Sequence, residues 1–256
     1  MNTQGNTYTF IYSIVLVVVV AAILAFVSLS LKPYQDENIR NEKRQNILSS
    51  ARIESTAENS EKLFNETIKK QYILNYKGEV IGEDAFNVDI PTEGKKFQSA
   101  VKSDAKLAEA LKTGTPLSTI ESAALAAIKF PVFEAEINGE VKYILPVYGA
   151  GLWGPIWGYI SLNADKNTVY GTLFDHKGET PGLGAEITTP KFENNFQGKT
   201  LFENGKLESI KVKKGGNATG MHEVDAISGG TITSNGVQTM LDNYFKCYEQ
   251  FLKQQQ

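Results

Sequence analysis

Apolar residues run almost without interruption from Phe10 to Leu31, and no charged side chain occurs before Lys32. At a rise of about 1.5 Å per residue, this stretch forms about 33 Å of helix, enough to cross a hydrocarbon core of roughly 30 Å. A lone strand would leave its backbone groups unpaired in lipid, whereas a helix pairs its own. The pattern therefore predicts a transmembrane helix at residues 10–31, after a short N-terminal tail at residues 1–9.

A cleaved signal peptide is the competing interpretation of this segment. It fits less well, because no Lys or Arg precedes the apolar run and the run exceeds the apolar region of a typical signal peptide.

The charges beside the span do not fix the orientation of the helix in the membrane. Basic residues such as Lys32 and Arg40 follow the span, which by the positive-inside rule favours a cytoplasmic domain, but long domains cross membranes largely regardless of flanking charge.

Charged residues and helix formers follow the span. Residues 36–58 mix charges with apolar positions such as Ile39, Ile47 and Leu48, which predicts a polar helix leaving the membrane. We assign residues 32–60 to this helical connector and residues 61–256 to one domain.

Alternation of apolar and polar residues marks the strands of that domain. Residues 73–81 carry Lys77-Gly78 between two apolar runs, and residues 132–148 carry Asn138-Gly139, the dipeptide favoured in a type I′ hairpin turn. Further strand-like runs lie at residues 155–162, 167–174 and 207–213. This alternation is typical of antiparallel strands with one solvated face.

After Ser234 the period changes to 3.6 residues. Val237, Met240, Leu241, Tyr244, Phe245, Tyr248 and Leu252 fall on one helical stripe. The pattern predicts a closing amphipathic helix, with Ser234 or Asn235 as its N-cap. The expected fold class is α+β: one N-terminal transmembrane helix, then a single, largely antiparallel domain closed by this helix.

Composition narrows the function further. The chain has 26 Lys and Arg against 29 Asp and Glu, a net charge of -3 and no large basic block, so it is a poor match for nucleic acid. A single cysteine, Cys247, excludes an intramolecular disulfide or a cysteine-rich metal site built from this chain alone.

Two motifs suggest enzyme sites that their context does not support. Residues 149–154 spell GxGxxG, but a dinucleotide-binding fingerprint opens a helix, whereas here Pro155 leads into a strand. Those glycines are better explained by close backbone approach, with Trp153 and Trp157 filling the core or forming the wall of a flat ligand site. His222, Asp225 and Ser228 are near in sequence, yet no nucleophile-elbow motif surrounds the serine.

The segment Ser-Gly-Gly-Thr-Ile-Thr at residues 228–233 offers different chemistry. It places small donors ahead of the predicted helix, where unpaired N–H groups and the positive end of the helix dipole favour a phosphate. A plain loop that caps the helix explains the same residues equally well. The residues alone leave both interpretations open.

With its flanks, this segment resembles the flavin-attachment site of FMN-carrying subunits in bacterial respiratory complexes. In that family an acidic residue precedes Ser-Gly-Ala-Thr-x-Thr, and the last threonine carries FMN through a phosphoester. In HEVDAISGGTITSNG at residues 222–236, Asp225 matches the acidic residue and Thr233 the acceptor. Gly230 departs from the usual alanine; this change removes one methyl group and loosens the loop.

Two further segments extend the resemblance nearly end to end. GETPGLGAEI at residues 178–187 is similar to the segment that the family places beside the flavin, and GLWGPIWGYISL occupies residues 151–162. The family includes the C subunits of sodium-translocating NADH:quinone oxidoreductases and the G subunits of Rnf-type ferredoxin:NAD oxidoreductases. The stretch from Trp153 to Trp157 favours the sodium-translocating type; a non-redox, membrane-anchored module remains the other alternative.

The resemblance implies an electron carrier with FMN on Thr233, attached by a separate flavin transferase, and with no catalytic residue or metal ligand of its own. The implied flavin residues are Thr233, Asp225, Ser228, Gly229, Gly230, Thr231, Ile232, Glu179, Thr180, Pro181, Gly182, Leu183, Gly184 and Trp153. Leu183 and Trp153 are the expected wall of the ring site, because the isoalloxazine ring is flat and largely apolar.

The resemblance also implies partners and a location. Electrons would come from an iron–sulfur centre of another subunit and pass to a flavin in a neighbouring membrane subunit. The complex would lie in the bacterial inner membrane, with the large domain on the periplasmic side.

Overall fold

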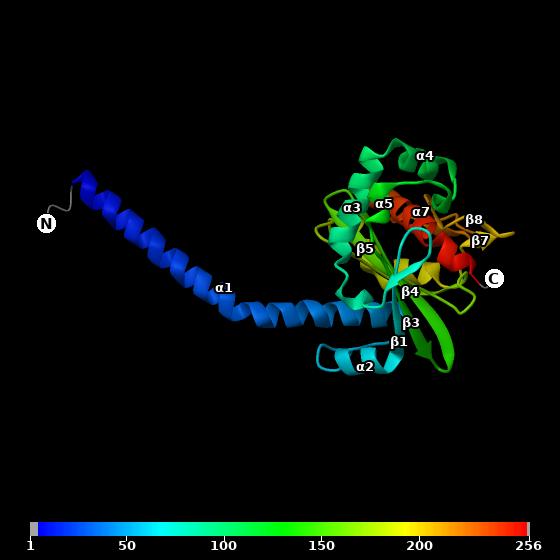
Figure 1. Cartoon of the computed structure of the whole chain (residues 1–256), viewed down its shortest axis with the longest axis horizontal. Helices are drawn as coiled ribbons and strands as arrows, with labels where there is room; N and C mark the ends of the chain where they lie inside the picture. The colour runs from blue at the N-terminus through cyan, green and yellow to red at the C-terminus, as the bar shows by residue number, and fades with distance from the viewer. Residues whose placement is uncertain (1–4, 255–256) are drawn as a thin grey trace. The chain divides into compact units, whose positions relative to one another are not determined.

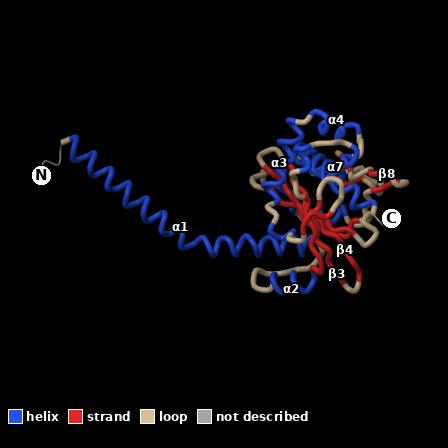
Figure 2. The backbone as a smooth tube through the Cα atoms, in the orientation of Figure 1, coloured by secondary structure: helices blue, strands red, loops and turns tan. Residues whose placement is uncertain are grey.

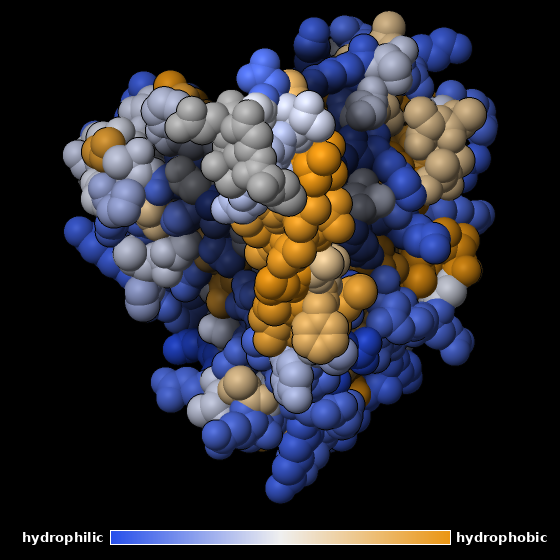
Figure 3. Space-filling model, turned by 90° about the vertical axis from the view of Figure 1, so that its left-hand side faces the viewer, coloured by the Kyte–Doolittle hydropathy of each residue, from blue (hydrophilic) through white to orange (hydrophobic). Residues whose placement is uncertain are grey.

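A computed structural model describes residues 5–254 of the chain, which forms two compact units, Met1–Arg44 and Gln45–Gln256. Residues 1–4 of the expected N-terminal tail lie outside the described residues. The first helix, α1, spans Asn6–Ser50 (Figure 1). Its apolar part is long enough to cross a membrane, and its side chains are exposed, with Phe10 at 69 % and Leu29 at 72 %. Figure 3 shows them as an orange band, consistent with a single-pass membrane anchor.

The polar helix predicted for residues 36–58 ends earlier than expected. α1 stops at Ser50, and Arg52 adopts the left-handed conformation with φ 62°. The N–H of Ile53 then donates to the carbonyl of Leu48, which closes the helix end. A short second helix, α2, follows at Ser60–Thr67.

A six-stranded sheet forms the centre of the second unit, in the order β2-β1-β3-β4-β5-β6, with every neighbouring pair antiparallel (Figures 1 and 2). The strands are β1 Ile68–Leu74, β2 Val80–Gly82, β3 Phe130–Ile137, β4 Glu140–Ala150, β5 Pro155–Leu162 and β6 Val169–His176. Both predicted hairpins are confirmed. Asn138 and Gly139 have φ angles of 53° and 79°, the two positive values that a type I′ turn requires.

Helices cover both faces of this sheet. On one face the Phe64 ring of α2 packs edge-on against Phe133, with ring centroids 6.1 Å apart. On the other face Phe130 packs against Tyr244 and Tyr248 of the C-terminal helix. The expectation of one solvated face is therefore wrong for the central strands, because both sets of alternating side chains are covered.

The segment between β2 and β3 is helical, which the sequence pattern did not predict. It contains η1 Ala85–Asn87, α3 Ile90–Ser103, α4 Ala105–Thr113, η2 Leu117–Thr119 and α5 Ala123–Ala126. Asp104 caps α4 by accepting the N–H groups of Lys106 and Leu107, and Gly114 ends it in the left-handed conformation. Gly94 lets α3 approach the Tyr148 ring of β4, since a Cβ there would lie 2.1 Å from the ring.

The run at residues 207–213 is not one strand. Ser209, with φ 60°, separates β8 (Lys206–Leu207) from β9 (Lys211–Lys213), and β9 pairs in parallel with β10 (Glu223–Asp225). The remaining short elements are η3 Gly184–Thr188, α6 Pro190–Glu193, η4 Asn194–Phe196, β7 Phe202–Glu203, β8 Lys206–Leu207, β9 Lys211–Lys213 and β10 Glu223–Asp225.

The closing amphipathic helix, α7, spans Thr231–Lys253 and packs on β4. Its start differs from the prediction: the N-cap is Gly230 rather than Ser234 or Asn235, so Thr233 lies inside the first turn. At the other end, the Lys166 ammonium donates to the carbonyls of Phe251 and Gln254. A cation at this end complements the helix dipole. The predicted α+β class is confirmed.

Candidate functional site

Three segments that are distant in sequence meet at the first turn of α7. One is the tip of the β4–β5 hairpin, where the N–H of Gly151 donates to the carbonyl of Gly154 across a tight turn. The backbone N–H of Trp153, within this turn, donates to Glu179 Oε1 at 2.8 Å. GxGxxG is thus part of an antiparallel hairpin and not of a βαβ unit, as the sequence context indicated.

The other two segments are residues 178–187 and the first turn of α7, and the hydroxyl of Thr233 joins them. Its Oγ1 donates to Glu179 Oε2 at 2.6 Å, and the two residues are only 2 % and 4 % exposed. A hydrogen bond to an ionised acceptor is roughly twice as strong as one between neutral groups. The N–H of Glu179 in turn donates to His176 Nδ1 at 3.2 Å, which holds the start of the 178–187 segment.

Two glycines make this close approach possible. A Cβ on Gly184 would lie 2.3 Å from Glu179 Oε2 and 2.4 Å from Thr233 Oγ1. A Cβ on Gly151 would lie 2.5 Å from Glu179 Oε1. No side chain fits at either position, so the backbone itself walls the carboxylate.

The start of α7 is favourable for an anion. Gly230 provides no side-chain cap, and the first turn holds no acidic residue. The N–H groups of Thr231, Ile232 and Thr233 precede the first carbonyl that the helix can offer them. Ser234, which is fully buried, accepts the N–H of Ile227 at 3.1 Å and so ties the preceding turn to the helix.

Exposed apolar side chains surround this helix start. Leu152 and Trp153 at the hairpin tip are 49 % and 68 % exposed, Leu183 is 43 % exposed and Ile232 is 57 % exposed. Leu183 packs against the turn at Gly229, where a Cβ would lie 2.7 Å from its Cδ2. An aromatic and three aliphatic side chains are thus available around the first turn.

Other predicted residues lie at the edge of this arrangement. Asp225 belongs to β10, and its Oδ1 accepts the N–H of Ala218, so its carboxylate holds the preceding loop. Ser228 is exposed in the turn before α7, and the exposed turn from Thr180 through Pro181 to Gly182 carries no hydrogen bond to Thr233 among the described residues.

The hydrolase triad that the sequence context argued against is also absent among the described residues. His222 Nδ1 lies 2.5 Å from the backbone carbonyl of Thr200.

Sequence reasoning missed three contributors. His176 supports Glu179 from three residues upstream, and Ser234 acts through Ile227 rather than as the N-cap. Gly236 lets α7 approach the end of β4, since a Cβ there would lie 2.3 Å from the Ala150 carbonyl oxygen. The glycine within the helical pattern was the available signal for this close contact.

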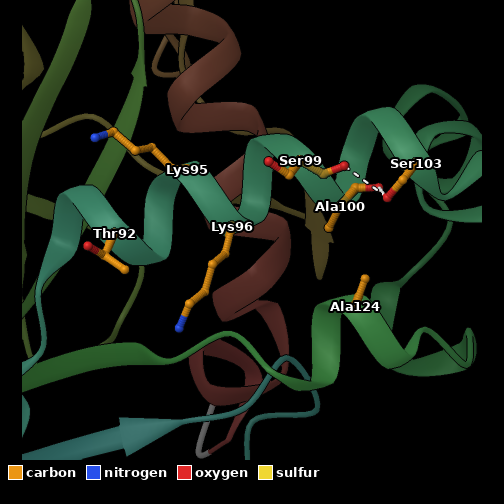
Figure 4. A pocket seen from close by; sticks show the side chains of 7 residues that line it. All are labelled: Thr92, Lys95, Lys96, Ser99, Ala100, Ser103 and Ala124. Atoms are coloured by element: carbon orange, nitrogen blue, oxygen red, sulfur yellow. Dashed lines mark hydrogen bonds between the residues drawn. The ribbon is translucent and has the colours of Figure 1, made fainter.

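A separate cavity of about 440 Å³ lies away from this cluster (Figure 4). It is lined by Thr92, Lys95, Lys96, Ser99, Ala100, Ser103 and Ala124 of α3 and α5. None of these residues belongs to the three segments that meet at Thr233. Lys95 and Lys96 point to different sides of α3 in Figure 4, and Lys96 pairs with Glu93 at 2.7 Å.

Comparisons with known proteins identify the domain family of the region that contains this cluster. Residues 151–246 match the family of FMN-binding domains. This range includes the hairpin tip, the 178–187 segment and the first turn of α7, which defines the chain as an FMN-binding-domain protein with an N-terminal apolar helix.

Relatives give the particular family. The chain is 35% identical over 253 residues to the C subunit of the Na(+)-translocating NADH-quinone reductase of Pasteurella multocida, covering 96% of this chain and 90% of that protein. The C subunit of Vibrio vulnificus is 32% identical, covering 88% and 84%. The chain belongs to the family of C subunits of Na(+)-translocating NADH-quinone reductases.

Solved structures agree with this assignment. A crystal structure of the C subunit from Parabacteroides distasonis is 40% identical, with a TM-score of 0.72, and covers 88% of this chain and 98% of that one. Shewanella oneidensis NqrC is 27% identical, with a TM-score of 0.66, and covers 84% and 96%.

The residues at the first turn fit the phosphate and ring of FMN. The helix start and the left-handed Gly229, with φ 78°, offer backbone N–H groups of the kind that bind anions. Leu183, Trp153 and Ile232 offer apolar surface for a ring.

Proposed function

We propose that this chain is a membrane-anchored electron carrier whose FMN is covalently joined to Thr233 by a phosphoester. When bound, the flavin accepts and donates single electrons. The chain's own residues retain it, orient it and shield its attachment point from water. The chain is therefore a redox subunit of a larger reductase and has no complete active site of its own.

One observation carries the proposal. Thr233 and Glu179, each inside a motif typical of flavin-carrying subunits, are joined by a buried hydrogen bond of 2.6 Å within the matched FMN-binding region. A loop that only caps a helix has no need to bury a threonine hydroxyl against a carboxylate 54 residues away. The paired motifs therefore support a flavin site at the first turn of α7, which contains Thr233.

The surrounding residues take the following roles in this proposal. The N–H groups of the first turn of α7 hold the phosphate, since helix N-termini favour anions. Leu183 and Trp153 lie against the ring. A phosphoester leaves the ring chemically unmodified, so these contacts tune its reduction potential.

The N-terminal apolar helix supports a location for this domain at a membrane, within a larger complex. We propose that residues 10–31 anchor it in the bacterial inner membrane and that the domain lies on the periplasmic side. Its partners are then an iron–sulfur subunit that supplies electrons, a membrane subunit with a second flavin that accepts them, membrane lipid, and a flavin transferase during maturation.

Two alternatives are less well supported. The G subunit of an Rnf-type complex is disfavoured by the relatives, which are C subunits of sodium-translocating reductases that match along nearly their whole length. A non-redox anchored module would keep its assembly and function without any modification of Thr233. Pull-down of partner subunits together with electron transfer in the Thr233→Ala chain separates this alternative from a carrier.

The direct test is covalent flavin content. The full-length chain, produced with a flavin transferase and denatured, is expected to stay yellow and to gain the mass of FMN less one water. Thr233→Ala should abolish both signals. Thr231→Ala removes the other threonine hydroxyl of the same helical turn and tests whether the flavin is joined there instead. Thr239→Ala, farther along the helix and exposed, is the control that should load normally. A colourless wild-type chain, or loss of flavin in Thr231→Ala alone, would contradict the proposal.

A further inference from the structure

We propose that the outer side of α3 and α4 is a docking surface for an acidic face of a partner subunit that exchanges electrons with the flavin. This inference rests on the proposed function, from which it takes the redox partner. Five exposed lysines form this basic α3–α4 surface: Lys95, Lys96, Lys102, Lys106 and Lys112.

The surface carries positive charge in a chain whose net charge is -3. Residues 90–113 hold five lysines and three acidic residues. Two of these acidic residues are already engaged, because Glu93 is buried and pairs with Lys96 at 2.7 Å, and Asp104 caps α4. Glu109 is the remaining acidic residue of the segment, so the exposed side of the two helices keeps an excess of positive charge.

The cavity of about 440 Å³ beside α3 gives this surface a shape that a partner can fill (Figure 4). Thr92, Lys96, Ser99 and Ser103 line it at helical spacing, so they share one face of α3, and Ala124 of α5 completes the lining. Hydroxyl and ammonium groups are the donors that this face offers. An acidic side chain of a partner is the group that such donors bind most strongly.

The surface fits a protein better than it fits a lipid membrane. A helix that binds a membrane surface inserts large apolar side chains among the lipids. The structure describes α3 and α4 in full, and neither helix exposes a large apolar side chain. Phe97 and Leu107, for example, are only 2 % and 0 % exposed.

The surface also lies on the side of the sheet that carries α7. Phe97 of α3 packs against Tyr244 of α7, with ring centroids 5.5 Å apart. Gly94 brings α3 against Tyr148 of β4, which leads into the hairpin tip at residues 149–154. A partner docked on α3 would therefore rest on a helix that packs directly against two elements of the flavin site. Opposite charges would steer and orient it during association.

Charge reversal at Lys95 and Lys102 tests the surface. Both side chains are exposed on α3 and make no ion pair with a described residue, so Lys95→Glu/Lys102→Glu should fold normally. Lys191→Glu/Lys214→Glu is the matched control, because it changes the net charge equally at exposed lysines outside these helices.

The assay measures binding of flavin-loaded, full-length chains in lipid-free detergent. The binding partner is the set of remaining reductase subunits, purified together from cells that lack this chain. Association rate constants and Kd values are measured at several KCl concentrations. Lys95→Gln/Lys102→Gln is measured as well, because it removes the two charges without adding negative ones to α3.

We expect the Kd of Lys95→Glu/Lys102→Glu to rise at least about tenfold at low salt, mostly through slower association. Lys95→Gln/Lys102→Gln should show a smaller rise. The Kd of the control should stay within about threefold of that of the unchanged chain, because isolated surface charges contribute little. Added KCl should weaken binding of the unchanged chain more than that of the charge-reversed chain, since salt screens exposed charges.

Distinct outcomes identify distinct failures. Equal Kd values for the charge-reversed chain and its control would overturn the docking surface. A difference that appears only after anionic phosphatidylglycerol is added would also overturn it, by assigning the lysines to a lipid surface. An unchanged chain that binds the other subunits but holds no flavin would instead overturn the proposed function.

Discussion

Gly184 lies so close to Thr233 that a Cβ on the glycine would come within 2.4 Å of the threonine Oγ1. Gly184→Ala must therefore separate the 178–187 segment from the first turn of α7. We expect covalent flavin loading to fall at least about tenfold, because losing a buried charge-assisted hydrogen bond costs about 1.5–3 kcal/mol. The mass of the denatured chain after incubation with the transferase and FAD measures this.

Gly178→Ala provides the control for that experiment. It adds the same methyl group to the same segment, but its Cβ would meet nothing within 4 Å. Equal loading by the two alanine variants would show that the close packing at Gly184 is irrelevant. Thermal unfolding of both variants, followed by tryptophan fluorescence, checks that the domain remains folded.

Tyr248 fastens α7 to the sheet. Its hydroxyl is buried, donates toward the Pro131 carbonyl at 2.9 Å and lies 3.1 Å from the Pro146 carbonyl oxygen. Tyr248→Phe leaves both carbonyls without this partner, so we expect the free energy of unfolding to fall by about 1–3 kcal/mol. Thermal or denaturant unfolding of the full chain in detergent measures the change. A stability equal to that of the unchanged chain would mean that the hydroxyl does not fasten the helix.

Glu193 makes stability depend on pH. Burial, the largest cause, raises the pKa of its carboxyl group from 4.5 to about 7. The folded state then binds more protons than the unfolded state between these values, so stability falls as pH rises from about 4.5 to about 7. Glu193→Gln keeps an oxygen that can accept the N–H of Phe174 and removes the charge.

We therefore expect Glu193→Gln to stabilise the chain at pH 8 by on the order of 1 kcal/mol, a value reduced for partial solvation of the carboxyl group. At pH 4 the variant and the unchanged chain should unfold at nearly the same temperature. Unfolding curves at the two pH values test this. An equal effect at both values would assign the change to packing rather than to charge.

Local sequence patterns were sufficient to predict much of the sheet. Asn138-Gly139 specified its turn because only two positive φ angles close that hairpin, and residues 155–162 formed β5 with the predicted limits. The sequence pattern did not predict the helices at residues 90–126. These helices are short, so their stability comes mainly from packing their apolar faces against the rest of the domain, which the local sequence does not reveal. The break at Ser209 was missed because its backbone conformation depends on tertiary contacts.

The motifs named residues that the fold brings together, but they did not predict how these residues contact one another. The motifs pointed to Glu179, Gly184 and Thr233 separately, whereas their contact depends on how β6 and α7 meet in the fold. Ser234 was expected to cap α7, because a serine before an apolar stripe is a common start signal. The helix instead begins one turn earlier at Gly230, which puts Thr233 inside it.

The most direct test is peptide mapping of this chain purified from its native membranes, without any added transferase. The account predicts that the peptide containing residues 222–236 carries one FMN, less water, and that fragmentation places it on Thr233. A peptide that is bare at Thr233, or modified instead at Thr231 or Ser228, would contradict the account.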